Sequence, residues 1–308
     1  MNTYRRTLIR TALLLGVVAS SSTQALTIQF DYRYDQGFFS AQERRDRLEQ
    51  AAGFFAGVRD SLAPIAPSVD DHWSVWFHNP SNLGGGQVRE DNLFVAADTL
   101  RVFVGGAAMG AGVLGYATTG TLEGVSGSAG FVDAVTSRGQ SNTYGPGATD
   151  YGVWGGAIAF NSDASWHWGA TEAGLDASRS DFLTTAVHEL GHILGYGPAD
   201  SWAAQQQGGL FLGAAAMAAY GGPVPVGGAH WAEGVTGHYA GQPQETLLDP
   251  STPAGMRQYP TDLDYAGLQD IGWEVRAVPL PPALWLMGSG IMLMALTAAR
   301  RKTTVDKH

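Results

Sequence analysis

The sequence contains no cysteine. Disulfides, thiolate ligands for zinc and cysteine nucleophiles are therefore excluded. Lysine is nearly absent as well, because both lysines of the chain, Lys302 and Lys307, lie close to its end. No run of like charges is long enough to indicate disorder, and no internal repeat of fixed period is present. Any metal site in this chain must depend on histidine, carboxylate or similar ligands.

The N-terminus has the pattern of a secretory signal. Arg5 and Arg6 precede an apolar run at residues 13–18, and a series of small and polar residues ends at Ala25. A basic segment, a short apolar core and a small-residue exit are the parts of a signal peptide. The pattern predicts a signal peptide over residues 1–25, with cleavage after Ala25.

The C-terminus has the pattern of a membrane-spanning segment. Residues 283–299 contain no charge, follow Pro281 and Pro282, and precede three basic residues at 300–302. At 1.5 Å per residue, such a helix would span about 26 Å, just enough to cross a bilayer. The basic residues after it predict a cytoplasmic end on that side.

This tail resembles the bacterial PEP-CTERM sorting signals, in the variant that begins VPLP and continues to WLMGSG and a closing ARRK. The resemblance covers residues 277–308. It implies export across the inner membrane, transient anchoring there, and removal of the tail by an exosortase-type enzyme. We therefore expect a protein that is secreted from a bacterium or held at its surface.

The part between these two signals, residues 26–276, is strongly acidic. Three of the 18 basic residues precede it and four follow it, which leaves 11 basic against 27 acidic residues and a formal net charge near −16. Nucleic acids and anionic membranes are bound through clustered lysine and arginine, so neither is expected as a partner. The length of this part suits one large domain.

The first elements of the domain follow from hydrophobic spacing. Apolar residues alternate over residues 26–34, which predicts a half-buried strand. Ser40 and Glu43 have the spacing of a capping box, and apolar residues then recur at helical intervals as far as Val58. We expect a long amphipathic helix here, ended by Pro64.

Further strands are predicted downstream. Residues 93–104 are rich in apolar and β-branched side chains and predict a central strand, whereas residues 105–147 read as long loops with short strands. Residues 154–161 predict another strand and a turn. Asn161 and Asp163 could bind calcium in that turn, although a capped turn explains them equally well.

The chemistry of the chain centres on the segment HELGH. Ser180 is expected to cap a helix over residues 181–194. His188 and His192 are four residues apart, so both imidazoles leave one face of that helix and could bind one Zn²⁺ at about 2.0–2.1 Å. Glu189 lies between them, close enough to take a proton from water activated by the metal.

The residues after this segment extend the pattern. His188, Glu189, His192 and Gly195 match the signature of the metzincin clan of zinc peptidases, to which the sequence is similar here. The glycine allows the chain to leave the helix in a sharp turn. The last position of the signature, a histidine in the clan, is Pro198, which cannot bind metal, so the third ligand must come from elsewhere.

Four residues are candidates for the third ligand: Tyr196, Asp200, His230 and His238. The clan includes leishmanolysin-like members, in which an insertion separates the glycine from a distant histidine. The segment FLGAAAMAAYGGPVPVGGAHW resembles such an insertion and favours His230. His238 is the second choice and Asp200 the third.

Other patches are similar to matrixin-like catalytic domains. Residues 262–273 resemble the final helix of such a domain, and residues 154–168 resemble its edge strand, along which substrate backbones pair. In the turn expected beneath the metal, Leu248 stands where the family has methionine, and Met256 is the alternative. The resemblance implies an α+β, zincin-like fold: a twisted mixed sheet packed with helices, one of which carries the metal-binding motif.

These patterns together predict an exported zinc metalloendopeptidase. His188, His192 and His230 would bind the zinc ion, and Glu189 would act as general base on a protein or peptide substrate. Two alternatives stay open. One is a zinc-dependent ester or amide hydrolase acting on polysaccharide, and the other is a non-catalytic matrix or adhesion protein with a degenerate site.

Overall fold

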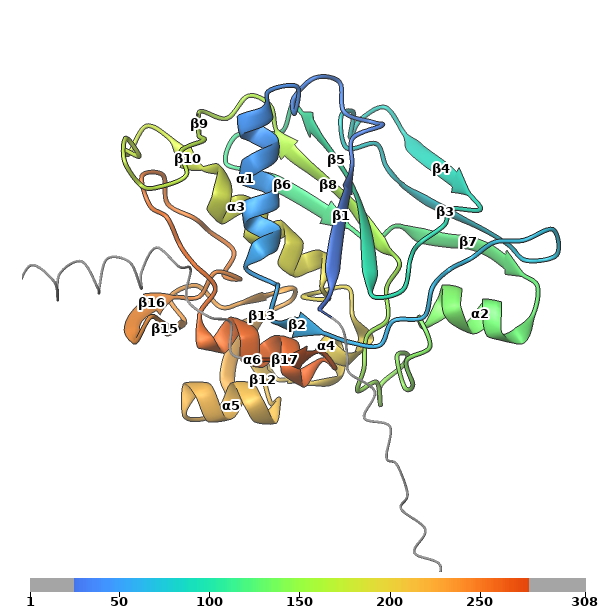
Figure 1. Cartoon of the computed structure of the whole chain (residues 1–308). Coiled ribbons are helices and arrows are strands. Elements are labelled where there is room, and N and C mark those ends of the chain that lie inside the picture. The colour runs from blue at the N-terminus through green and yellow to red at the C-terminus, as the bar shows by residue number, and fades with distance from the viewer. Residues whose placement is uncertain (1–24, 277–308) are drawn as a thin grey trace, which may run out of the picture.

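The computed structural model describes residues 25–276, and they form an α+β fold (Figure 1). The expected signal peptide at residues 1–25 lies outside this range except for its last residue, and so does the expected tail with its segment at residues 283–299. Within the described range, none of the helices combines the length and the apolar composition that a bilayer crossing requires.

A mixed four-stranded sheet forms the centre of the fold. Its strands are β1 (Thr27–Asp31), β5 (Thr99–Ala107), β8 (Gly155–Asn161) and β6 (Gly115–Thr118), in that order. The first three are parallel, and β6 is antiparallel to β8. Strands of a parallel sheet that are covered on both faces need apolar side chains throughout, and every residue of β8 is buried. The central strand expected within residues 93–104 is confirmed as β5, although it begins later.

The expected role of residues 154–168 as an edge strand is wrong. β8 pairs with β5 on one side and with β6 on the other, so it has no free edge. The edge strands of this sheet are β1 and, next to β8, β6, which lies in the glycine-rich stretch expected to form long loops with short strands. The same stretch also holds β7 (Thr121–Ser126) and a helix that its composition does not predict, α2 (Ala129–Thr136). Ser128 caps α2 by accepting the Phe131 N–H.

The central sheet is covered on both faces. On one face Phe160 of β8 contacts Phe182 of helix α3 (Phe182–Ile193), with 4.7 Å between ring centroids. On the other face Phe103 of β5 stacks on Phe77 at 4.8 Å. Phe77 belongs to β3 (His72–His78), the middle strand of an antiparallel sheet completed by β4 (Gln87–Asp91) and β7. The fold therefore has a helical layer, a mixed sheet and an antiparallel sheet.

Helix α1 (Gln42–Gly53) packs on α3 and differs from its expected bounds. Its N-cap is Ala41 without a side-chain hydrogen bond, so the capping box expected at Ser40 is wrong. The helix also ends at Gly53 rather than near Pro64. Val58 lies in β2 (Val58–Arg59), which pairs with β17 (Glu274–Val275) near the end of the described chain. Backbone pairing to a distant segment thus overrides the helical spacing of Val58.

The segments after β8 contain the helix that carries the HELGH segment and a group of small elements. The short strands β9 (Trp166–His167) and β10 (Ser180–Asp181) pair with each other, and β10 directly precedes α3 (Phe182–Ile193) in the chain. Beyond α3, small elements surround a second aromatic core, and Figure 1 shows α5 and α6 grouped below the sheet. They are α4 (Asp200–Ala204), β11 (Gln206–Gln207), β12 (Leu210–Phe211), α5 (Ala214–Tyr220), β13 (Val224–Gly227), β14 (His230–Trp231), β15 (Thr236–Tyr239), β16 (Gln242–Glu245) and α6 (Asp262–Asp270). The helix expected within residues 262–273 is confirmed as α6.

Candidate metal centre

Helix α3 is fixed at its N-terminus by a buried ion pair. The N-cap is Asp181 rather than Ser180, which lies in β10: Asp181 Oδ2 accepts the Thr184 N–H at 3.0 Å. The Arg257 guanidinium donates to both carboxylate oxygens of Asp181, at 2.9 and 2.7 Å. Both side chains are almost fully buried, at 1 and 0% exposed. Two fixed hydrogen bonds from one guanidinium orient the first turn of the helix.

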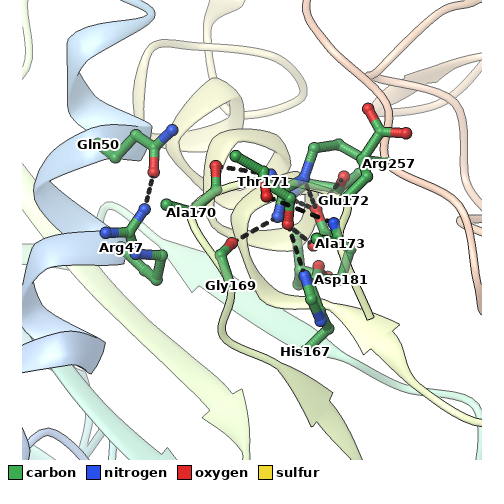
Figure 2. Close-up of polar contacts among 12 residues, drawn as sticks. Arg47, Gln50, His167, Gly169, Ala170, Thr171, Glu172, Ala173, Asp181 and Arg257 are labelled. Atoms are coloured by element: carbon green, nitrogen blue, oxygen red, sulfur yellow. Dashed lines mark hydrogen bonds and ion pairs between the residues drawn. The ribbon is translucent and has the colours of Figure 1, made fainter. Parts of the chain in front are cut away.

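Figure 2 shows how the rest of this guanidinium is used. Arg257 also donates to the carbonyl oxygens of Gly169 and Ala170, at 2.8 and 3.0 Å. In the same loop, the His167 ring lies 2.8 Å from the carbonyl of Thr171. A charge buried this deeply is tolerated only when its donors are satisfied. The segment between β9 and β10 is thereby tied to the start of α3.

Three imidazoles meet beyond the middle of α3. His188 and His192 lie one turn apart on the helix, and their Nε2 atoms are 3.1 Å apart. His230 enters from β14, with its ring centroid 5.2 Å from that of His188 and 4.8 Å from that of His192. One nitrogen from each ring lies within 4.8 Å of the others. The structure thus brings together the three histidines that the sequence analysis selects.

The hydrogen bonds of the rings define which nitrogen is free. His188 Nδ1 lies 2.8 Å from the Leu247 carbonyl, and His192 Nδ1 lies 2.8 Å from the Tyr196 carbonyl. A carbonyl accepts only, so each Nδ1 carries the proton and each Nε2 of a neutral ring presents a lone pair. Two facing lone pairs repel one another. A tetrahedral zinc ion with bonds of 2.0–2.1 Å holds its nitrogen ligands about 3.3 Å apart, close to the observed separation.

Burial keeps the three rings neutral. It lowers the pKa of His188 to about 3, with the neighbouring His192 adding to the effect, and it lowers the pKa of His230 to about 4. Burial also lowers the pKa of His192. Neutral imidazole is the form that binds metal ions. The donor set and its protonation therefore fit a zinc ion, and they do so at ordinary pH.

The floor under the histidines is Leu248. A Cβ placed on Gly191 of α3 would lie 2.9 Å from Leu248 Cδ1, so this leucine packs directly against the helix, and it is 1% exposed. Met256, in contrast, is 50% exposed. Of the two residues that the sequence leaves open, Leu248 occupies the apolar position beneath the site.

Asp264 is a buried residue that the sequence analysis does not single out. Its carboxylate accepts the N–H groups of Leu247 and Leu248, at 3.0 and 3.2 Å, and the indole N–H of Trp231 at 3.2 Å. Burial raises the pKa of Asp264 above its usual value. The hydrogen bonds from the backbone N–H groups of Leu247, Leu248 and Thr261 make this increase smaller. One side chain of α6 therefore connects the floor of the site to the strand that carries His230. Its position in the first turn of a helix is the only signal the sequence offers.

The other candidate ligands lie elsewhere. His238 is exposed in β15, with its Nδ1 3.2 Å from Asp262. Asp200 begins α4 and accepts the Gly145 N–H at 2.6 Å. Tyr196 is buried, and its hydroxyl donates to a backbone carbonyl of α6 at 2.5 Å. The site contains the main-chain carbonyl of Tyr196 but not its phenol.

The turn after β8 has the geometry of the capped turn. Asn161 Oδ1 accepts the Asp163 N–H at 3.0 Å, and Asn161 Nδ2 donates to the Val113 carbonyl at 2.7 Å. Asp163 is exposed. Asn161 is thus used by the protein itself, and no group of three potential ligands is present there within the described part of the chain.

Glu189 lies beside the three histidines at the base of a cleft. It is 5% exposed, and burial raises its pKa to about 8. A positive ion nearby would favour its charged form and lower that value. The cleft has a volume of about 900 Å³, and β6 and residues 250–252 are among the segments that line it. A Cβ on Gly115 of β6 would lie 2.5 Å from Glu189 Oε1, so the carboxylate packs against this edge strand.

The arrangement joins three neutral nitrogen ligands, a buried carboxylate and an open cleft. Such a constellation can activate water and receive an extended substrate. No family model, curated protein or solved structure matches this chain.

Proposed function

We propose that this protein is an exported, zinc-dependent metalloendopeptidase with a zincin-like fold. One observation carries the proposal: the nitrogen atoms of His188, His192 and His230 converge beside the buried carboxylate of Glu189, at the base of a cleft bordered by an edge strand. Export and cell-surface or secreted location rest on the terminal sequence patterns alone.

Three nitrogen ligands match a catalytic rather than a structural zinc site, since a structural site is closed by a fourth protein ligand. Zinc, when bound here, would supply a Lewis acid that polarises a carbonyl and acidifies water. The carbonyls of Leu247 and Tyr196 hold the rings of His188 and His192 in the ligating orientation. These backbone contacts preorganise the site.

Glu189 has the position of a general base. Its carboxylate lies next to the ligands yet is not one of the three converging groups. In the proposed reaction it takes a proton from the attacking water and delivers it to the leaving amine, so the same side chain acts twice. A non-catalytic zinc site has no need of a buried carboxylate, whose desolvation is unfavourable.

The edge strand supports an extended peptide as substrate. β6 pairs with β8 on one side and has no second partner strand among residues 25–276. A peptide can add to such an edge through backbone hydrogen bonds. The strand borders the same cleft as the histidines, so a bound backbone would pass the site.

Replacement of Glu189 tests the proposal. We expect Glu189→Gln protein to bind one equivalent of zinc and to lose casein cleavage by a factor of about 10² or more, as the loss of a general base implies. Zinc content is measured by elemental analysis and cleavage by release of labelled peptides. Zinc-bound Glu189→Gln protein that cleaves casein at the wild-type rate would contradict the proposal.

The same proteins separate the two alternatives. Wild-type protein that binds zinc, leaves peptides intact and cleaves esters or amides of a polysaccharide would favour the carbohydrate hydrolase. Zinc binding with no hydrolysis of either substrate would favour a matrix or adhesion protein.

A further inference from the structure

Three carboxylates gather outside the histidine site. Glu233 lies in the turn after β14, Glu245 ends β16, and Asp249 follows the floor residue Leu248. One oxygen from each lies within 4.8 Å of the others. Asp249 is 0% exposed, whereas Glu233 is exposed, so the cluster extends from the interior to the surface.

Asp249 has an oxygen that the protein leaves without a partner. Its Oδ1 accepts the Ser251 N–H at 3.1 Å, but its Oδ2 is buried and has no hydrogen bond. Burial raises the pKa of Asp249, and the neighbouring Glu245 carboxyl adds to the effect through its charge and through a hydrogen bond to the protonated form. A buried, unpaired carboxylate is strongly unfavourable and is normally compensated by a cation or a proton.

The other two carboxylates are held in place by one oxygen each. Glu245 Oε1 accepts the Gly234 N–H at 2.8 Å, and Glu233 Oε1 accepts the Ser251 hydroxyl at 2.7 Å. Within the described range, none of the three acidic groups forms an ion pair with an arginine or histidine. The cluster is therefore oriented by neutral donors and keeps up to three negative charges uncompensated.

We propose that Glu233, Glu245 and Asp249 form a calcium site, separate from the three histidines. All three ligands are hard carboxylate oxygens, which calcium prefers, and no nitrogen ligand is among them. Calcium accepts six to eight oxygens in flexible geometry, so solvent can complete its shell on the exposed side at Glu233. Magnesium would demand a stricter octahedral arrangement.

The place of this cluster gives calcium a structural role. It connects the turn that follows His230 and Trp231 with the loop that contains Leu247 and Leu248. Those two segments already meet where the Trp231 N–H donates to the Leu248 carbonyl at 2.9 Å. Ser251, which touches both Glu233 and Asp249, also lines the cleft. A bound ion would thus fix the loop that contains Leu248 and the part of the cleft lining formed by Ser251.

Calcium binding and thermal unfolding test this inference without any use of hydrolysis. Purified, zinc-loaded protein is freed of calcium on a chelating resin, reloaded with zinc alone, and then titrated with calcium chloride in a calorimeter. We expect one calcium ion per chain and a rise of several degrees in the unfolding midpoint. Absence of both effects in the wild type would overturn the proposal.

Variants locate the site. Asp249→Asn is expected to abolish the calcium-dependent rise and, without calcium, to unfold no earlier than the wild type, because it removes the buried repulsion. Glu233→Gln, at an exposed position that folding tolerates, is expected to weaken calcium binding by about tenfold or more. If Asp249→Asn fails to fold, the calcium affinity of Glu233→Gln alone tests whether the cluster binds calcium. A full calcium response in Glu233→Gln or in folded Asp249→Asn would contradict the assignment.

Two controls separate this site from the others. Asp163→Asn removes an exposed carboxylate outside the cluster and is expected to keep the whole calcium response, which excludes a general effect of the acidic surface. His188→Ala is expected to lose zinc and still bind calcium. Loss of calcium binding in either folded control would overturn the proposal, whereas inactivity of a calcium-binding wild type would count only against the proposed peptidase.

Discussion

At the scale of single residues, the contact between Gly115 and Glu189 links the edge strand to the candidate general base. A methyl group at Gly115 would lie 2.5 Å from Glu189 Oε1, closer than real contacts allow. Glu189 Cδ and Cγ would both lie at 2.7 Å, so the outer part of this side chain has to move as a unit, whereas the nearest atoms include none of the backbone. The proton acceptor, however, would be displaced.

We therefore expect Gly115→Ala protein to keep its zinc and its stability, and to lose kcat/KM for peptides by about tenfold or more, equivalent to about 1.4 kcal/mol. Gly124 of β7 is a matched control, because a Cβ there meets no atom within 4 Å. Elemental analysis, thermal unfolding and peptide cleavage are measured on both variants. Equal activity of Gly115→Ala and Gly124→Ala would contradict this reading.

Asp60 predicts a pH-dependent change in stability. Its Oδ2 is buried without a hydrogen bond, and burial raises its pKa from 3.8 to about 6. The folded protein therefore holds this proton more tightly than the unfolded chain, and stability is lost as pH rises from about 4 to about 6. Above this window the charged carboxylate is unfavourable.

Asp60→Asn is expected to raise the free energy of unfolding by about 2 kcal/mol at pH 7.5. The gain should shrink as the pH falls below about 6. Urea unfolding of wild type and variant across this range isolates the effect, since the histidine site contributes equally to both. Asp70→Asn, at an exposed position, serves as control, and a gain that did not change with pH would contradict the argument.

At the scale of elements, the buried pair of Asp181 and Arg257 determines how α3 starts. Removal of one partner leaves an uncompensated buried charge, so Arg257→Leu is expected to lower the free energy of unfolding by about 3–5 kcal/mol. Asp181→Asn combined with Arg257→Leu should cost less than the sum of the two single changes. Arg89→Leu, which breaks two exposed pairs, with Asp91 and Glu123, should cost less than about 1 kcal/mol. Chemical unfolding measures all four, and strict additivity would contradict the coupling.

The elements that the sequence predicts well are those with local determinants. α3 follows from its apolar spacing, and α6 is expected from the resemblance of residues 262–273 to a final helix. The structure adds a capping box of Thr261 and Asp264 at the start of α6. α1 ends early, and the bounds of β6 within a stretch expected to hold short strands are not predicted, because the limits of both elements depend on partners far along the chain. β6 has glycine where a carboxylate approaches it, so its composition resembles a loop.

Some residues of the candidate site could likewise be predicted from local sequence, and others could not. His188, Glu189 and His192 follow from spacing on one helix, and the family resemblance selects His230. The roles of Asp264 and Arg257 could not be predicted from the sequence, because both side chains bind backbone groups that only the fold brings near. The cluster of Glu233, Glu245 and Asp249 could not be predicted from the sequence either, because turns separate the three residues along the chain.

At the scale of the whole molecule, the three histidines join two parts of the described chain. His188 and His192 belong to the helix packed on the central sheet, and His230 belongs to the small elements beyond it. A ligand that binds only the folded state stabilises it, by about 2.7 kcal/mol when its concentration is 100 times its Kd. Metal binding should therefore stabilise the molecule as a unit.

We expect zinc to raise the unfolding midpoint of the metal-free protein by about 5–10 °C, given about 2–4 °C per kcal/mol for a chain of this size. His230→Ala should lose most of this rise, because two ligands on one helix no longer connect the two parts. Scanning calorimetry with and without zinc measures both. A full zinc response in His230→Ala would exclude that histidine as a ligand.

The acceptors that orient His188 and His192 are main-chain carbonyls, those of Leu247 and Tyr196. A carbonyl of the peptide chain persists whatever side chain the residue bears. Replacing the side chain of Leu247 or Tyr196 therefore leaves the acceptor itself in place. Reorienting either ring would require a shift of the main chain at Leu247 or Tyr196 rather than the loss of a side-chain acceptor.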